Sequence, residues 1–325
     1  MPDSQTGVRT TVSTDLFDRY LLPKVALGVI LLGSLLGTWV SGRFGGQSIA
    51  VTLAKWSYLV AIGVLTGGLV WKHGFVRPRD LGANAGDYCG EMYARFDRIA
   101  IGAVALLAVT GPIVLAAYVS ALGTKPLTVG LGAMLVAWLG TVAVTAQRSA
   151  AAEAQFRSPA GILALTLALA VVAGTGIAEV SLRGFDPIAA GVRTTHLFAF
   201  AAWIGGAVWN IFIAVPTGQK RPTTAVVRAA GDQLERFRWT VRFIIPLVFL
   251  TGSYQAVMVL GVSLEGYAAT TVGWAVIAKI GIIGLLAVIF KLCPMWRACS
   301  PIEGVCDLEE SGAGSGAAGG GDDDD

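Results

Sequence analysis

One histidine, His196, has the residue type and the position of a metal ligand. It opens an apolar stretch, and Trp203 follows seven residues later on the same helical face. Imidazole is a common ligand for copper and other transition metals. An ionisable group inside an apolar span is also a functional candidate, because its burial without a partner is costly. The alternative is an interfacial histidine hydrogen-bonded to a loop carbonyl, and residue type alone does not decide between the two.

Two further charges fall inside apolar stretches. Lys279 lies about eight residues into the last stretch, and Glu179 lies near the end of the fifth. A lysine at such a position must extend to the interface or find an acid or a carbonyl. We therefore expect a Lys279–Glu179 pair, with a role of Lys279 in substrate passage as the alternative.

Two side chains in the seventh stretch could complete a soft-metal site around His196. Met258 and Tyr254 are four residues apart on one helical face and are expected at the depth of His196. Thioether and imidazole together suit monovalent copper. Methionine is also a common filler of apolar gaps.

These residues must be positioned by membrane-spanning helices. The chain is 54% hydrophobic and only 14% charged, with a mean hydropathy of +0.68. This composition predicts an all-α integral membrane protein, because a soluble domain of this size needs more polar surface. Eight stretches are long enough to cross a bilayer as helices: about 25–41, 52–71, 98–119, 127–146, 160–181, 194–214, 240–261 and 271–292.

The basic residues predict the orientation of these spans. Eighteen of the 24 Lys and Arg residues fall in the N-terminal tail, the loops after spans 2, 4 and 6, and the C-terminal tail. This asymmetry predicts that both termini lie in the cytoplasm. We expect a cytoplasmic N-terminal tail over 1–24 with no cleaved signal, and a disordered, glycine-rich acidic tail within 294–325.

The chain also contains an internal repeat. Residues 58–71 (YLVAIGVLTGGLVW) align with 196–209 (HLFAFAAWIGGAVW), and Arg95-Phe96 aligns with Arg236-Phe237. Ordered markers at near-equal spacing indicate a duplicated unit. Each copy begins its motif on an even-numbered span, which predicts two parallel four-helix repeats, a degenerate half over 25–150 and a second half over 158–293. The first half differs at the three candidate positions, with Tyr58, Leu65 and Val136 in place of His196, Trp203 and Lys279.

The remaining ligand-type residues point away from two common kinds of site. All four cysteines are expected on the cytoplasmic side, where thiols stay reduced, and Cys293, Cys299 and Cys306 have no standard zinc spacing. The second histidine, His73, is expected at the opposite membrane face from His196. Two histidines at opposite faces do not form the axial pair of one six-coordinate haem.

The second half resembles the membrane domain of the copper resistance protein D (CopD) family. The resemblance rests on His196, Trp203 with Gly205-Gly206, Arg236-Phe237, Thr251-Gly252, and Gly273 with Lys279, and it covers about 190–295. It implies a multispan inner-membrane protein for copper uptake or tolerance. The chain departs from that family in its few methionines and in lacking a recognisable fused copper-binding domain.

We therefore expect a non-enzymatic, permease-like protein that moves or senses copper, with His196 at the outer entrance. Its expected partners are the lipid bilayer and a copper-binding protein on the outer face, and no nucleic acid. The alternative is a redox membrane subunit that binds haem b or a quinone.

Overall fold

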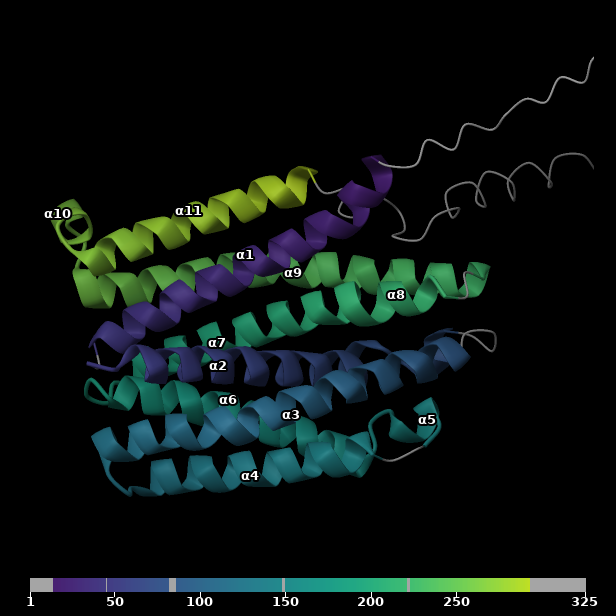
Figure 1. Cartoon of the computed structure of the whole chain (residues 1–325), viewed down its shortest axis with the longest axis horizontal. Coiled ribbons are helices and arrows are strands. Elements are labelled where there is room, and N and C mark those ends of the chain that lie inside the picture. Colours follow the sequence, from purple (N-terminus) through teal and green to yellow (C-terminus); the bar gives the residue numbers. More distant parts are fainter. Residues whose placement is uncertain (1–13, 45, 82–85, 148–149, 221–222, 293–325) are drawn as a thin grey trace, which may run out of the picture.

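A computed structural model describes residues 14–44, 46–81, 86–147, 150–220 and 223–292, and within these ranges the chain is helical (Figure 1). The four spans of the first half are α1 (Thr14–Phe44), α2 (Ile49–Val70), α3 (Gly86–Leu122) and α4 (Pro126–Ala146). Those of the second half are α6 (Pro159–Ser181), α7 (Pro187–Val208), α9 (Thr224–Leu260) and α11 (Thr271–Leu292). Short segments join them: η1 (Trp71–Phe75), η2 (Pro78–Leu81), α5 (Ala152–Gln155), η4 (Trp209–Ala214), α8 (Val215–Gly218) and α10 (Leu264–Ala268).

Among the described residues, eight helices are long and apolar enough to cross a membrane, which confirms the predicted all-α membrane fold. The connections near 46–48, 123–125, 182–186 and 261–270 lie at one end of the bundle, here called the short-loop end (Figure 1). The opposite end, which holds the loops after α2, α4 and α7, is called the basic-loop end. Residues 1–13 and 293–325 lie outside the described residues, and so do Cys293, Cys299 and Cys306. The predictions made for these two segments stay predictions.

Two spans are much longer than hydropathy predicts. Both α3 and α9 contain 37 residues and begin over ten residues before the apolar stretches that predicted them. These added N-terminal parts contain charged residues such as Glu91 and Glu235, but they also contain buried apolar side chains such as Met92 and Leu234. The helices therefore continue beyond the apolar belt, because one face still packs on the bundle.

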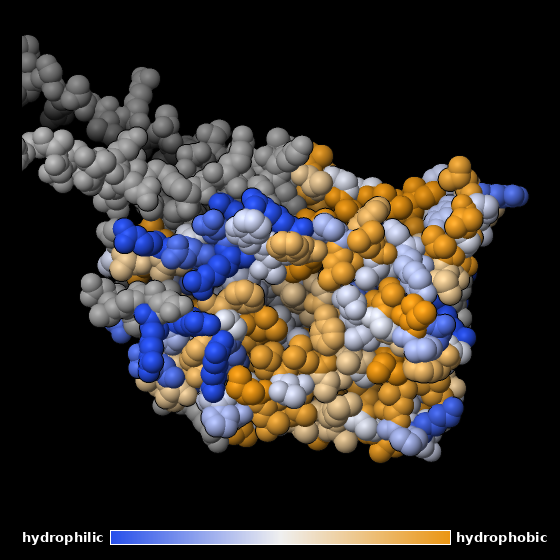
Figure 2. All heavy atoms as spheres, turned by 180° about the vertical axis from the view of Figure 1, so that it is seen from behind, coloured by the Kyte–Doolittle hydropathy of each residue, from blue (hydrophilic) through white to orange (hydrophobic). Residues whose placement is uncertain are grey.

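The outer surface suits a bilayer. Figure 2 shows hydrophobic residues over much of this face and hydrophilic residues gathered at one end of the molecule. Large apolar side chains on α9 are strongly exposed, including Phe243 at 69% and Leu250 at 65%. In lipid such exposure has no hydrophobic cost, because the surrounding solvent is itself apolar.

The helices α2 and α7 form the centre of the bundle and touch through glycines. A Cβ atom placed on Gly205 would meet the backbone of Gly67 and, at 2.7 Å, the nitrogen of Gly68. A Cβ atom on Gly67 would in turn lie 2.7 Å from the Cα of Gly205. Only residues without side chains allow this close backbone approach.

Reciprocal contacts across this centre confirm the repeat. The rings of Trp71 and Phe237 lie 6.0 Å apart, and those of their counterparts Trp209 and Phe96 lie 5.6 Å apart. A π-helical segment begins at both Trp71 and Trp209. Each contact thus occurs twice with the halves exchanged, which is the property of a two-fold relation. As the second and sixth spans, α2 and α7 run in the same direction, so the two repeats are parallel.

The arginines that the repeat retains make one of these reciprocal contacts. Arg236 Nη1 donates to the carbonyl of Phe75 at 2.6 Å, and Arg95 Nη1 donates to that of Phe212 at 3.3 Å. Both carbonyls belong to the π-helical segments, where regular helical pairing is interrupted. Arg236 therefore joins the halves near the basic-loop end and takes no part in a site around His196.

The first span of each half packs against the last span of the other half, so α1 lies on α11 and α6 lies on α4. The two-fold relation then fails at one place. Helix α3 packs along α4, but the equivalent helices α9 and α11 make no comparable contact. The second half is consequently more open than the first in the region where His196 and Lys279 lie.

Candidate functional site

The start of α7 determines the depth of the site. Asp186 caps this helix, since its Oδ1 accepts the Ala189 amide at 2.7 Å, and Pro187 occupies the first turn. The helix therefore begins seven residues before the predicted span. His196 lies nine residues after Pro187, about 14 Å along the axis at 1.5 Å per residue. It is an interior residue of the helix, with 8% of its surface exposed, and does not open the span.

A threonine of α9 holds the imidazole ring. Thr251 Oγ1 lies 2.9 Å from His196 Nδ1 and 2.6 Å from the carbonyl of Leu247. A carbonyl can only accept, so the single hydroxyl proton goes to Leu247 and the hydroxyl oxygen accepts from His196 Nδ1–H. The Nε2 atom then carries the lone pair, and the backbone of Val248 is a further hydrogen-bond partner of the imidazole. This is how histidine ligands of metals are commonly oriented by a second group.

A cavity of about 80 Å³ lies beside this ring. Its polar lining includes Arg193, His196, Trp203 and Lys279, and the described residues place no acidic side chain in it. The rest of the wall is mainly apolar and comes from five helices, with Ile30 and Gly33 of α1, Leu59 of α2, Phe200 of α7, Val248 of α9, and Ile282, Ile283 and Leu286 of α11. The indole nitrogen of Trp203 is buried without a hydrogen-bond partner.

Lys279 crosses from α11 to α1 rather than to Glu179. Its Nζ lies against Gly37, where an added Cβ atom would be 2.8 Å away. No ion pair joins Lys279 to Glu179 in the described part of the chain, so the expected pair is wrong. Glu179 is instead held by cations from α2 and α7, which are closer to it than α11 is.

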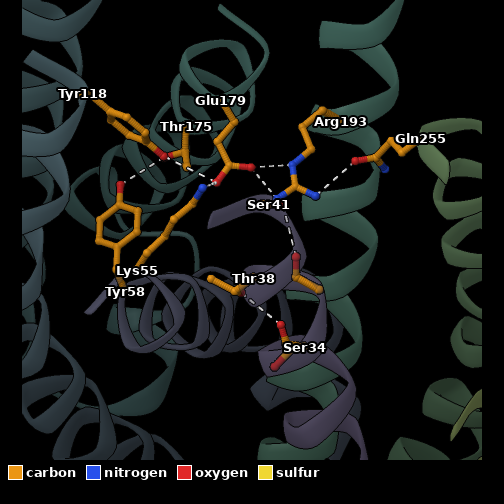
Figure 3. A network of polar contacts seen from close by, with 11 residues as sticks. Ser34, Thr38, Ser41, Lys55, Tyr58, Tyr118, Thr175, Glu179, Arg193 and Gln255 are labelled. Atoms are coloured by element: carbon orange, nitrogen blue, oxygen red, sulfur yellow. Dashed lines mark hydrogen bonds and ion pairs between the residues drawn. The ribbon is translucent and has the colours of Figure 1, made fainter. Parts of the chain in front are cut away.

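Glu179 is the centre of a buried charge network (Figure 3). Lys55 Nζ lies 2.7 Å from Oε1, and both side chains are less than 10% exposed. The guanidinium of Arg193 binds Oε2 through two nitrogens, with Nε at 2.5 Å. Such a two-nitrogen contact is stronger and more directional than a single one. Three helices are thereby joined at this depth, because Lys55 comes from α2, Glu179 from α6 and Arg193 from α7.

Arg193 connects this network to the cavity. Its Nη1 donates to Gln255 Oε1 at 3.1 Å, and Gln255 Nε2 donates to the carbonyl of Thr251 at 3.0 Å. Thr251 is also the partner of His196. Hydrogen-bonded residues thus connect Glu179 to the imidazole, with Thr251 contributing its carbonyl to Gln255 and its hydroxyl to His196. Together with Lys55, the network places two cations around one carboxylate.

The structure does not bring the two other predicted ligands to His196. Met258 is 60% exposed and does not line the cavity, and neither does Tyr254. Met258 lies seven residues beyond Thr251, about 10 Å further along α9 at 1.5 Å per residue. Both residues are on the predicted helix, but the longer α7 places His196 deeper than the depth at which they were expected to meet it.

The corresponding place in the first half is closed. Tyr58, the counterpart of His196, is completely buried, and its hydroxyl lies 3.0 Å from Thr175 Oγ1. Leu65 and Leu135 are buried as well. Val136, the counterpart of Lys279, is 70% exposed. The first half therefore presents neither a histidine nor a lysine at the two equivalent positions.

Three important residues are missed by the sequence prediction. Lys55 lies inside the predicted span 52–71, and a lysine within an apolar stretch is a signal that could have found it. Arg193 falls just before the predicted start of its span and therefore counts as a loop residue. Thr251 is a marker of the repeat, but its partner Thr110 bonds only to the carbonyl of Leu106, so the repeat alone does not indicate contact with a histidine.

These observations define a site by geometry alone. No family model, curated protein or solved structure matches the chain.

Proposed function

We propose that this chain is a permease-like membrane protein that binds and moves monovalent copper, with His196 as the protein ligand. The observation that carries the proposal is the orientation of His196, whose Nδ1–H is held by Thr251 so that Nε2 is available beside a cavity. A neutral imidazole nitrogen is a suitable ligand for copper. The resemblance of residues 190–295 to the CopD family supports the same cargo.

The closed first half supports a single site per chain. A duplicated protein can retain a ligand site in one half while the other half becomes structural. Tyr58, Leu65 and Val136 lack a strong metal ligand, whereas His196 and Lys279 retain nitrogen atoms.

The placement in the cell is part of the same proposal. The bilayer itself follows from the eight apolar helices. We place the protein in the plasma membrane with the basic-loop end and both termini in the cytoplasm, because basic loops favour that side. The cavity then lies towards the outer face, where a copper-binding protein would deliver the cargo.

A redox role is the second candidate, and the cavity favours one form of it. The cavity contains one histidine among its described lining residues, so it lacks the axial pair of a six-coordinate haem. The N–H groups of Trp203 and Lys279 could donate to a quinone carbonyl beside His196. Extraction of a quinone from the purified protein, without bound copper, would favour this candidate.

Copper accumulation in cells tests the proposed function. Replacement His196→Ala should reduce accumulation to the level of cells without the protein, because it removes the ligand nitrogen. The variant Thr251→Val keeps the ligand but loses the group that orients it, and the copper affinity should fall about 10–100-fold. Copper content per cell is measured at equal amounts of protein in the membrane.

The matched control is His73→Gln. His73 lies at the basic-loop end, where its Nδ1 accepts the amide of Arg157 at 3.2 Å, and a glutamine oxygen can replace that acceptor. Accumulation should be unchanged in this variant. Full accumulation in the His196→Ala variant would exclude His196 as the copper ligand.

A further inference from the structure

The charges around His196 restrict the form in which copper can bind there. Arg193 and Lys279 both line the cavity, and no acidic side chain of the described residues does. The nearby carboxylate of Glu179 is already shared by Arg193 and Lys55. A bare cation beside His196 would therefore be repelled by positive groups at short range in a medium of low dielectric constant.

The same cavity contains hydrogen-bond donors without acceptors. The Nε1–H of Trp203 is buried and unpartnered, and Trp203 is only 6% exposed. Lys279 adds a second set of N–H groups, and the described residues provide no carboxylate for it. A buried donor without an acceptor is costly, so these groups favour an occupant that brings a negative charge and lone pairs.

Resting on the proposed function, we propose that the cavity takes copper(I) together with a halide ligand, from an anionic chloride complex such as CuCl₂⁻. Monovalent copper is soft and readily keeps a coordination number of two, so one imidazole and one chloride satisfy it. In the binding step, the Cu–Nε2 bond forms, one Cu–Cl bond breaks and a chloride ion leaves. Copper remains monovalent, and the total charge of minus one is conserved.

Three polar groups of the cavity then have a role. His196 binds the metal, while Trp203 and Lys279 donate to the retained chloride. The cavity of about 80 Å³ has room for a copper ion and one chloride, because a cavity of about 10–15 Å³ already holds one water molecule. Gly37 is required as well, since a side chain there would displace the Lys279 amine.

The test is equilibrium copper(I) binding to the full chain in lipid nanodiscs, measured by competition with a chromogenic copper(I) chelator. Titrations are made in sodium nitrate and in sodium chloride at equal ionic strength, and the chelator alone is calibrated in both salts. We expect chloride to increase the affinity of the wild-type protein at least about tenfold, as one hydrogen bond to a charged group would give.

Two variants assign this chloride effect to the cavity. Lys279→Met and Trp203→Phe should each reduce the ratio of the copper affinity in chloride to that in nitrate. Lys125→Met, on an exposed loop, should leave this ratio unchanged. Because Lys279→Met could impair folding, Trp203→Phe provides an independent test of the chloride site. Size-exclusion chromatography checks that both variants are monodisperse. When sodium bromide replaces sodium chloride in the titration, the X-ray absorption spectrum of the bound copper should show a bromine neighbour.

The outcomes separate this inference from the proposed function. Copper binding that depends on His196 but is equal in chloride and nitrate would overturn the halide ligand and leave the copper function standing. Absence of copper binding in both salts would overturn the proposed function and this inference with it. A chloride effect that persists unchanged in both cavity variants would also contradict the halide site.

Discussion

Replacement of Glu179 by alanine is expected to lower the free energy of unfolding by about 3–5 kcal/mol, the range found when one partner of a buried ion pair is removed. The carboxylate lies between Lys55 and Arg193, and its side chain is 6% exposed. Its removal leaves two cations facing each other at a depth where water cannot solvate them. Helices α2, α6 and α7 would lose their common contact.

Unfolding of the purified protein by denaturing detergent measures this effect. Glu265→Ala is the matched control, because Glu265 is an exposed acid on α10, and surface changes of this kind stay within about 0.5 kcal/mol. The double variant Glu179→Leu with Lys55→Met should recover part of the loss, because it removes one stranded cation. Equal stability of the Glu179→Ala and Glu265→Ala variants would show that the network does not hold the helices together.

The second large effect is expected at the crossing of the two halves. Gly205→Leu should destabilise the protein by more than about 3 kcal/mol, at or above the upper end of the range for overpacked cores. The new Cβ atom would meet backbone atoms of Gly67 and Gly68, and backbone cannot rotate away as a flexible side chain can. Since α2 and α7 form the centre, their separation would disturb both halves.

A glycine on the outside of the bundle provides the comparison. Gly102 lies on α3 with no neighbouring atom within 4 Å of an added Cβ, so Gly102→Leu should leave the unfolding midpoint almost unchanged. Folded protein yield and the unfolding midpoint are measured for both variants. A Gly205→Leu variant as stable as Gly102→Leu would mean that the helices do not cross at this glycine.

The membrane fold could be predicted from the sequence because hydropathy is a local property. Each apolar stretch predicts one membrane span. The residues shared by the two repeats predict that the halves are related by a two-fold axis and run in the same direction. Hydropathy does not predict the residues at which the helices begin. Helix α7 begins with a polar segment that includes Arg193, and the cap at Asp186 and Pro187 continues the helix where hydropathy falls. The depth of His196 was misjudged for this reason.

The partners of the buried charges could not be predicted in the same way. Which acid a lysine meets depends on which helices are neighbours, and a single sequence does not contain that information. Lys279 is on α11, which packs against α1, so it meets Gly37. Glu179 is on α6, which packs against α2 and α7, so it meets Lys55 and Arg193. The missing contact between α9 and α11, which opens the cavity, likewise has no signature in the sequence.

Copper(I) titration of the purified protein in chloride is the most direct test of the central claim that His196 is the ligand of a single copper site. The wild-type chain should bind one copper ion per chain, with a nitrogen neighbour in the X-ray absorption spectrum, and the His196→Ala variant should bind none. One copper ion bound equally tightly by both proteins would contradict the account.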